Sequence, residues 1–67
     1  MTRAAAYLLS LIREVPGKSF SGLRRLTGWA RTALIDALAS LYHRGLIVVR
    51  PVPEPEWGTV AHRVWAR

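Results

Sequence analysis

The sequence predicts a small α+β domain, mainly α, made of three helices followed by a C-terminal β-hairpin. Apolar residues recur at spacings of three and four over the first two thirds of the chain, glycines separate these segments, and two strand-like runs follow. A chain of 67 residues is shorter than the usual domain. We therefore expect residues 1–67 to form a single domain around one hydrophobic core.

The first predicted helix begins after Thr2, whose hydroxyl can accept a hydrogen bond from the helix N-terminus, and ends at Pro16-Gly17. Its apolar side chains recur at helical spacing and are expected to face the core: Ala5, Leu8, Leu9, Ile12 and Val15. Lys18–Phe20 is expected to be a short extended link.

A second, brief helix is predicted after Ser21, which is expected to be its N-cap. Leu23 and Leu26 are three residues apart, and both are expected to face inward. Gly28 should end this helix, because glycine adopts the left-handed conformation that closes many helices.

The third predicted helix runs from about Ala30 to Arg44, and Gly45 should provide its left-handed C-cap. One stripe of apolar residues is expected to face the core: Ala30, Leu34, Ala37, Leu38 and Leu41.

Two strand-like runs, Leu46–Arg50 and Thr59–Trp65, are predicted to pair as a hairpin. The segment 51–58 contains three prolines in five residues, so we expect it to leave the ladder and form a stiff, protruding loop. The last strand leaves two possibilities open. Val60 and Val64 could face inward and leave Trp65 exposed at a dimer contact, or Trp65 could face inward beside Arg63.

The chain carries 10 Lys and Arg against 4 Asp and Glu, which gives a net charge of +6 and a pI near 11.5. Such an excess favours a polyanionic partner, because phosphates attract cations and release counterions when they bind them. All but one of the cations are Arg, whose planar fork suits phosphate and guanine. There is no Cys, and the longest apolar stretch, Ala4–Ile12, is too short to span a membrane. We expect a cytoplasmic protein without membrane partners.

The segment from Leu23 to Leu34, LRRLTGWARTAL, is followed by Leu41–Ile47, LYHRGLI. It resembles the helix-turn-helix of bacterial winged-helix regulators of the MarR and ArsR types. In those families a leucine-bearing helix is followed by a glycine turn and a second helix. The second helix ends in a leucine, three mostly polar residues and Gly-Leu-Val or Gly-Leu-Ile. The match is good over residues 20–50 and topological over the rest. It implies a winged helix-turn-helix that binds double-stranded DNA with its third helix in the major groove.

The resemblance places four residues of the third helix at base edges: Arg31, Thr32, Ile35 and Asp36. Arg31 can form two hydrogen bonds with guanine or contact phosphate, Thr32 can contact a phosphate or a thymine methyl, and Ile35 can make apolar base contacts. Asp36 can accept a hydrogen bond from a cytosine amine or orient Arg31. The alternative for Arg31 is a solvated surface arginine.

Further DNA contacts are expected from Arg24, Arg25 and Ser21 at the second helix, where side chains meet the duplex backbone. Ser21 is first of all a cap, and the two arginines could simply be solvated. In the hairpin, or wing, Arg50 and Arg63 could flank a minor groove or remain solvated.

The tip of the wing departs from a DNA-contacting pattern, because Glu54 and Glu56 would repel phosphate beside Trp57. This tip suits a protein partner better. Trp29 is expected either to pack over the corner of the helix-turn-helix or to stack on a sugar or a partner, and Trp65 is a third candidate for protein contact.

No paired carboxylates, nucleophile motif or phosphate-binding glycine loop is present, and His43 and His62 are isolated. We expect no enzyme activity, metal or cofactor. The leading hypothesis is a sequence-specific double-stranded DNA-binding regulator that acts as a homodimer or array, since one module offers little contact area. The alternative is a winged-helix module that binds a protein of a nucleic-acid-processing complex. RNA binding has weaker support.

Overall fold

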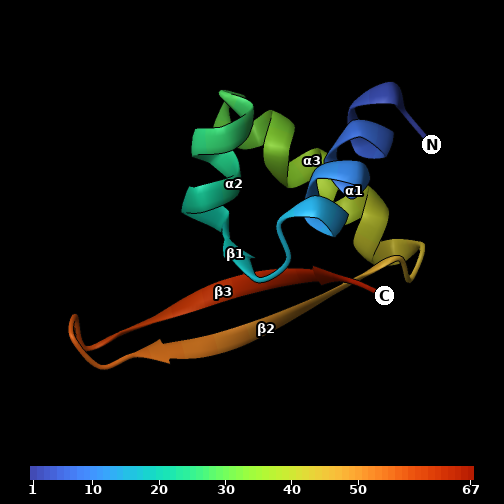
Figure 1. Cartoon of the computed structure of the whole chain (residues 1–67). Coiled ribbons are helices and arrows are strands. Elements are labelled where there is room, and N and C mark those ends of the chain that lie inside the picture. Colours follow the sequence, from blue (N-terminus) through green and yellow to red (C-terminus); the bar gives the residue numbers. More distant parts are fainter.

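In the computed structural model, which describes residues 1–67, three helices gather on one side of a three-stranded antiparallel sheet (Figure 1). The elements in chain order are α1 (Arg3–Glu14), β1 (Lys18–Ser19), α2 (Phe20–Thr27), α3 (Arg31–His43), β2 (Ile47–Glu54) and β3 (Thr59–Ala66). The predicted three helices and C-terminal hairpin are confirmed. The link that follows α1 pairs with β3 as the short strand β1, so the order in the sheet is β1-β3-β2.

Helix α1 begins as predicted at its threonine cap, where the Ala5 N–H donates to Thr2 Oγ1 over 3.1 Å. One side of α1 packs against α3 and β3. The ten buried residues of the molecule form a single cluster that joins the helices to the sheet: Ala5, Leu8, Leu9, Ile12, Leu23, Leu34, Ala37, Leu41, Ile47 and Val64.

Helix α2 starts earlier than predicted, and its N-cap is Ser19 rather than Ser21. Ser19 has extended backbone angles, and its Oγ accepts from the Gly22 N–H over 3.1 Å, whereas Ser21 is an exposed residue of the first turn. The inward placement of Leu26 is also wrong, because this side chain is 51% exposed. Leu26 lies about 60° around the helix from Leu23, which is the only buried residue of α2. Only a narrow side of this eight-residue helix therefore contacts the core.

Helix α3 occupies the predicted segment, with Ala30 and Arg44 as its caps rather than as helical residues. Leu34 and Leu41 are completely buried, while Ala30 is exposed and does not belong to the core stripe. Glycines close both α2 and α3 as expected. The Gly28 N–H donates to Arg24 O and the Gly45 N–H to Tyr42 O, each over 2.9 Å, with φ angles of 69° and 70°.

Strand β2 is longer than predicted, because it continues through Pro51 and Pro53 to Glu54. The expectation that the prolines would end the ladder is wrong, since β2 lies at the edge of the sheet and pairs only with β3. Every second N–H of an edge strand points away from the partner, and prolines two residues apart can occupy such positions. The turn is confined to residues 55–58.

The structure decides the orientation of β3. Val64 faces the core and is 2% exposed, whereas Val60 near the turn is 55% exposed. Trp65 lies on the other face of the sheet and is half-buried against Gly17. Beside it, Arg63 Nη1 donates to Gly17 O over 2.8 Å, so the turn that follows α1 is held against β3.

Candidate nucleic-acid interface

The turn between α2 and α3 is fixed by its own polar groups. The Thr27 hydroxyl donates to Arg24 O over 3.3 Å, and the Trp29 N–H donates to Thr27 Oγ1 over 3.2 Å. Gly28 has the left-handed conformation, and only three residues separate the end of α2 from the start of α3. The turn therefore sets where the first residue of α3 lies relative to α2.

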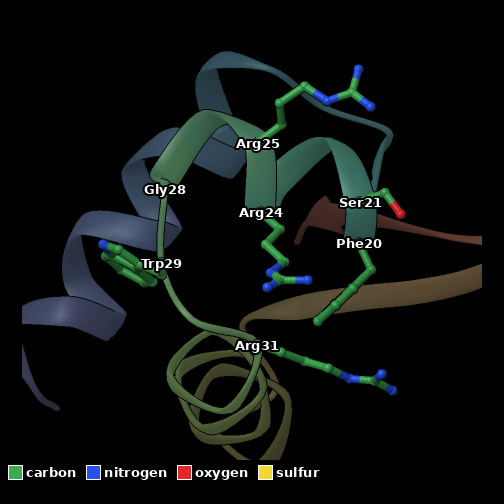
Figure 2. A pocket seen from close by; sticks show the side chains of 7 residues that line it. All are labelled: Phe20, Ser21, Arg24, Arg25, Gly28, Trp29 and Arg31. Carbon is green, nitrogen blue, oxygen red and sulfur yellow. The ribbon is translucent and has the colours of Figure 1, made fainter.

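An open hollow of about 610 Å³ lies between α2 and the start of α3 (Figure 2). We call it the arginine hollow, and its walls are Phe20, Ser21, Arg24, Arg25, Gly28, Trp29 and Arg31. No Asp or Glu lines it, so its potential is set by the three arginines. An anion of phosphate chemistry is the ligand that such a surface favours.

The three arginines do not point in the same direction. Figure 2 shows Arg24 extending from α2 into the hollow on the same side as Phe20, with Arg31 below it, whereas Arg25 points away on the other side of α2. All three arginine side chains are exposed. A polyanion bound in the hollow would thus contact Arg24 and Arg31 directly, and Arg25 only at the rim.

The other residues predicted for α3, Thr32, Ile35 and Asp36, are all exposed. Asp36 lies about 140° around the helix from Arg31, so the two side chains leave α3 in different directions. This geometry does not favour the suggested role of Asp36 in orienting Arg31. Asp36 instead places a negative charge on an exposed side of α3 that differs from the side of Arg31.

In the wing, Arg50 and Arg63 are direct partners across β2 and β3. They differ in freedom, because Arg63 is half-buried and donates to Gly17 O while Arg50 is exposed. The two residues alternate with Val64 and therefore lie on the face of the sheet turned away from the helical core. In the stem of the wing, Arg50 is thus the arginine whose side chain is free to contact a ligand.

The three tryptophans lie in different surroundings. Trp29 is half-buried with its ring 5.8 Å from that of Tyr7, so it packs over the corner of the helix-turn-helix, one of the two expected arrangements. Trp65 is half-buried against Gly17. Trp57 is 74% exposed at the tip, close to Glu54 and Glu56, and is the only one of the three that is freely accessible.

The sequence interpretation missed two features of this surface. Phe20 is part of α2 and forms a wall of the arginine hollow, although it was expected to belong to the link. Ala39 and Tyr42 extend the exposed side of α3 that begins with Arg31 and Ile35. Ala39 and Tyr42 follow Arg31 by eight and eleven residues, and this helical spacing is the sequence signal that could have found them.

No model of a known protein family matches the sequence, and neither does any curated protein. Among solved structures, a MarR family transcription regulator matches 100% of this chain with a TM-score of 0.82 and 24% sequence identity. The fold is a winged helix. The chain spans 42% of the length of that regulator's chain. In winged-helix terms, α2 and α3 form the helix-turn-helix and the β2–β3 hairpin forms the wing.

No group of three or more His, Cys, Asp or Glu side chains is arranged to hold a metal ion. None of the helices has both the length and the apolar character required to cross a membrane.

Proposed function

We propose that this winged-helix domain binds double-stranded DNA as part of a transcription regulator, with α3 in the major groove and α2 against the phosphate backbone. The observation that carries the proposal is the arginine hollow, whose three arginines surround the turn of the helix-turn-helix without a carboxylate among them. The fold shared with a MarR family transcription regulator supports it. We assign the chain to the bacterial MarR- or ArsR-like type and to the cytoplasm.

In this proposal the exposed side chains have two kinds of role. Arg24 and Arg25 contact phosphates and position the domain, while Arg31 contacts a base edge, preferably guanine, at the start of α3. Arg50 is the residue of the wing that can reach a second groove. The proposal assigns no catalytic residue, metal or cofactor.

The experiment that tests the proposal is selection of bound fragments from random duplex DNA at two ionic strengths. We expect the protein to enrich a sequence, Arg31→Ala to relax the preference at one position, and Arg24→Ala to weaken all sequences alike. Arg13→Ala is the matched control, because Arg13 is an exposed arginine of α1 outside the arginine hollow. Wild-type protein that enriches nothing and binds duplex DNA no better than Arg24→Ala does would contradict the proposal.

A second copy is expected on the DNA. One domain of this size offers limited contact area, so useful specificity calls for two half-sites occupied by a homodimer or an array. The selected sequences should then contain a repeated or inverted half-site. Light scattering of the complex should give two chains per duplex, and one chain per duplex would contradict this part of the proposal.

A protein partner of the wing is the second candidate function, and the exposure of Trp57 favours it. A tryptophan that is 74% exposed on a stiff, acidic turn is a suitable anchor for a protein surface. In this case Trp57→Ala should abolish capture of a partner and leave duplex affinity unchanged. Loss of duplex affinity in Trp57→Ala would instead place the tip on DNA.

A further inference from the structure

A second hollow, of about 360 Å³, opens between α3 and β2 and is mainly apolar. We call it the apolar hollow, and its walls are Phe20, Ile35, Leu38, Ala39, Tyr42, His43 and Val49. Ile35 is 42% exposed, Tyr42 59% and Val49 37%. Phe20 and Leu38 also pack against the buried core, whereas Ile35, Tyr42 and Val49 are exposed, so core packing does not account for the apolar character of these three side chains.

The apolar hollow continues the arginine hollow. Phe20 lines both, and Arg31, Ile35, Ala39 and Tyr42 lie in one row along α3 because they are separated by four, four and three residues. Ile35 follows Arg31 by about 6 Å along the helix axis, which corresponds to about two base pairs of a duplex. If Arg31 contacts a base edge in the major groove, Ile35 and Ala39 therefore lie next to the following base pairs.

The composition of the chain restricts which bases this row can recognise. Adenine is usually recognised in the major groove by the two hydrogen bonds of an Asn or Gln side chain, and the sequence contains neither residue. Arg31 can recognise guanine. Beyond Arg31 the row presents Ile35 and Ala39, which have no side-chain hydrogen-bonding groups, and the apolar feature of the major groove is the C5-methyl group of thymine.

We propose that Ile35 and Ala39, flanked by Tyr42, recognise pyrimidine C5-methyl groups, and that the protein therefore distinguishes A·T pairs by the thymine methyl. The inference rests on the proposed function and names the base chemistry that α3 selects. It also extends to 5-methylcytosine, which carries its methyl group at the same position in the groove. Cytosine methylation at these positions then strengthens binding in the way that a thymine does.

The test uses one duplex obtained from the selection, resynthesised with deoxyuridine in place of thymidine. Uracil lacks only the methyl group, so base pairing and the phosphates remain the same. We expect a loss of affinity of about fourfold for each methyl group that is contacted. The dependence of binding on salt should stay unchanged. A third probe places 5-methylcytosine, paired with guanine, at a sensitive thymine position, and it should bind more tightly than unmethylated cytosine there.

Two variants connect the effect to the row. Ile35→Thr keeps the branched shape and adds a hydroxyl, and Ala39→Ser makes a minimal polar change; each should bring the thymine-to-uracil affinity ratio toward one. Ala33→Ser is the matched control, because Ala33 is exposed on α3 but lies on the opposite side from Ile35. Thermal unfolding followed by circular dichroism verifies that every variant is folded.

The outcomes separate this inference from the proposed function. Salt-dependent, sequence-selective binding with equal affinity for the thymine and uracil probes overturns methyl recognition and leaves the proposed function standing. Absence of duplex binding overturns both. Variants of Ile35 and Ala39 that change self-association in light scattering, with no change in the thymine-to-uracil ratio, show that a second copy covers the apolar hollow and overturn the inference.

Discussion

Replacing Arg24 with Ala should change how steeply DNA binding depends on salt. Arg24, Arg25 and Arg31 are the cations of the arginine hollow. In the proposed orientation Arg24 and Arg25 each neutralise one phosphate, whereas Arg31 contacts a base edge. Two phosphate contacts on a duplex correspond to a slope of about −1.8 in a plot of log affinity against log salt concentration. Raising the salt from about 50 mM to about 200 mM should then lower the affinity of the wild-type protein about 12-fold.

Arg24→Ala removes one of these contacts. Its slope should be about −0.9, so the same rise in salt should lower its affinity only about 3.5-fold. The measurement is fluorescence anisotropy of a labelled duplex titrated at four or more salt concentrations. Arg13→Ala has the same net charge as Arg24→Ala but lies outside the arginine hollow, and it should keep the wild-type slope.

The comparison of the two variants decides whether the reasoning holds. If Arg24→Ala and Arg13→Ala reduce the slope equally, binding depends on net charge alone and the hollow has no special role. If neither variant changes the slope, the duplex contacts another part of the molecule, and the orientation proposed for α2 and α3 is refuted.

Two further pairs of variants test the fold that positions this surface. Ser19→Ala should lower the free energy of unfolding by about 1 kcal/mol because Ser19 caps α2, whereas Ser21→Ala should change it by less than about 0.5 kcal/mol. Urea unfolding followed by circular dichroism measures both free energies. The reverse ranking would make Ser21 the cap. Gly17→Ala and Gly45→Ala each place a side chain at a positive φ, at a cost of about 1–2 kcal/mol. Only at Gly17 would the added Cβ lie 3.2 Å from Trp65 Nε1, so Gly17→Ala should melt at a lower temperature than Gly45→Ala, and equal melting temperatures would argue against the Trp65 contact.

The parts of the fold that were predicted correctly depend on local patterns. The buried positions of α1 recur at helical spacing, and Gly28 and Gly45 close their helices through their own backbone conformations. Neither kind of signal needs information from a distant segment. The expected cap at Ser21 was wrong because Ser19 lies in β1 and pairs with Arg63 of β3, and this long-range pairing sets where the backbone turns into α2.

The candidate site could be predicted only in part for the same reason. Arg24, Arg25 and Arg31 were identified from their positions around a glycine turn, and the structure brings them to one hollow. The apolar side of α3 was not identified beyond Ile35, because a sequence does not show which apolar residues stay exposed. Tyr42 belongs to that surface because Phe20 and Val49 of β2 line the same hollow, and the sequence alone does not bring these distant residues together.

The two prolines of β2 also have a consequence for solubility. A strand of this length at the open edge of a sheet would ordinarily present a row of amide donors to which another unfolded or partly folded chain could add. Pro51 and Pro53 have no N–H, so they interrupt that row near the protruding end of the hairpin. They therefore protect the domain against aggregation through edge-to-edge strand addition, and leave self-association to surfaces other than the free edge of β2.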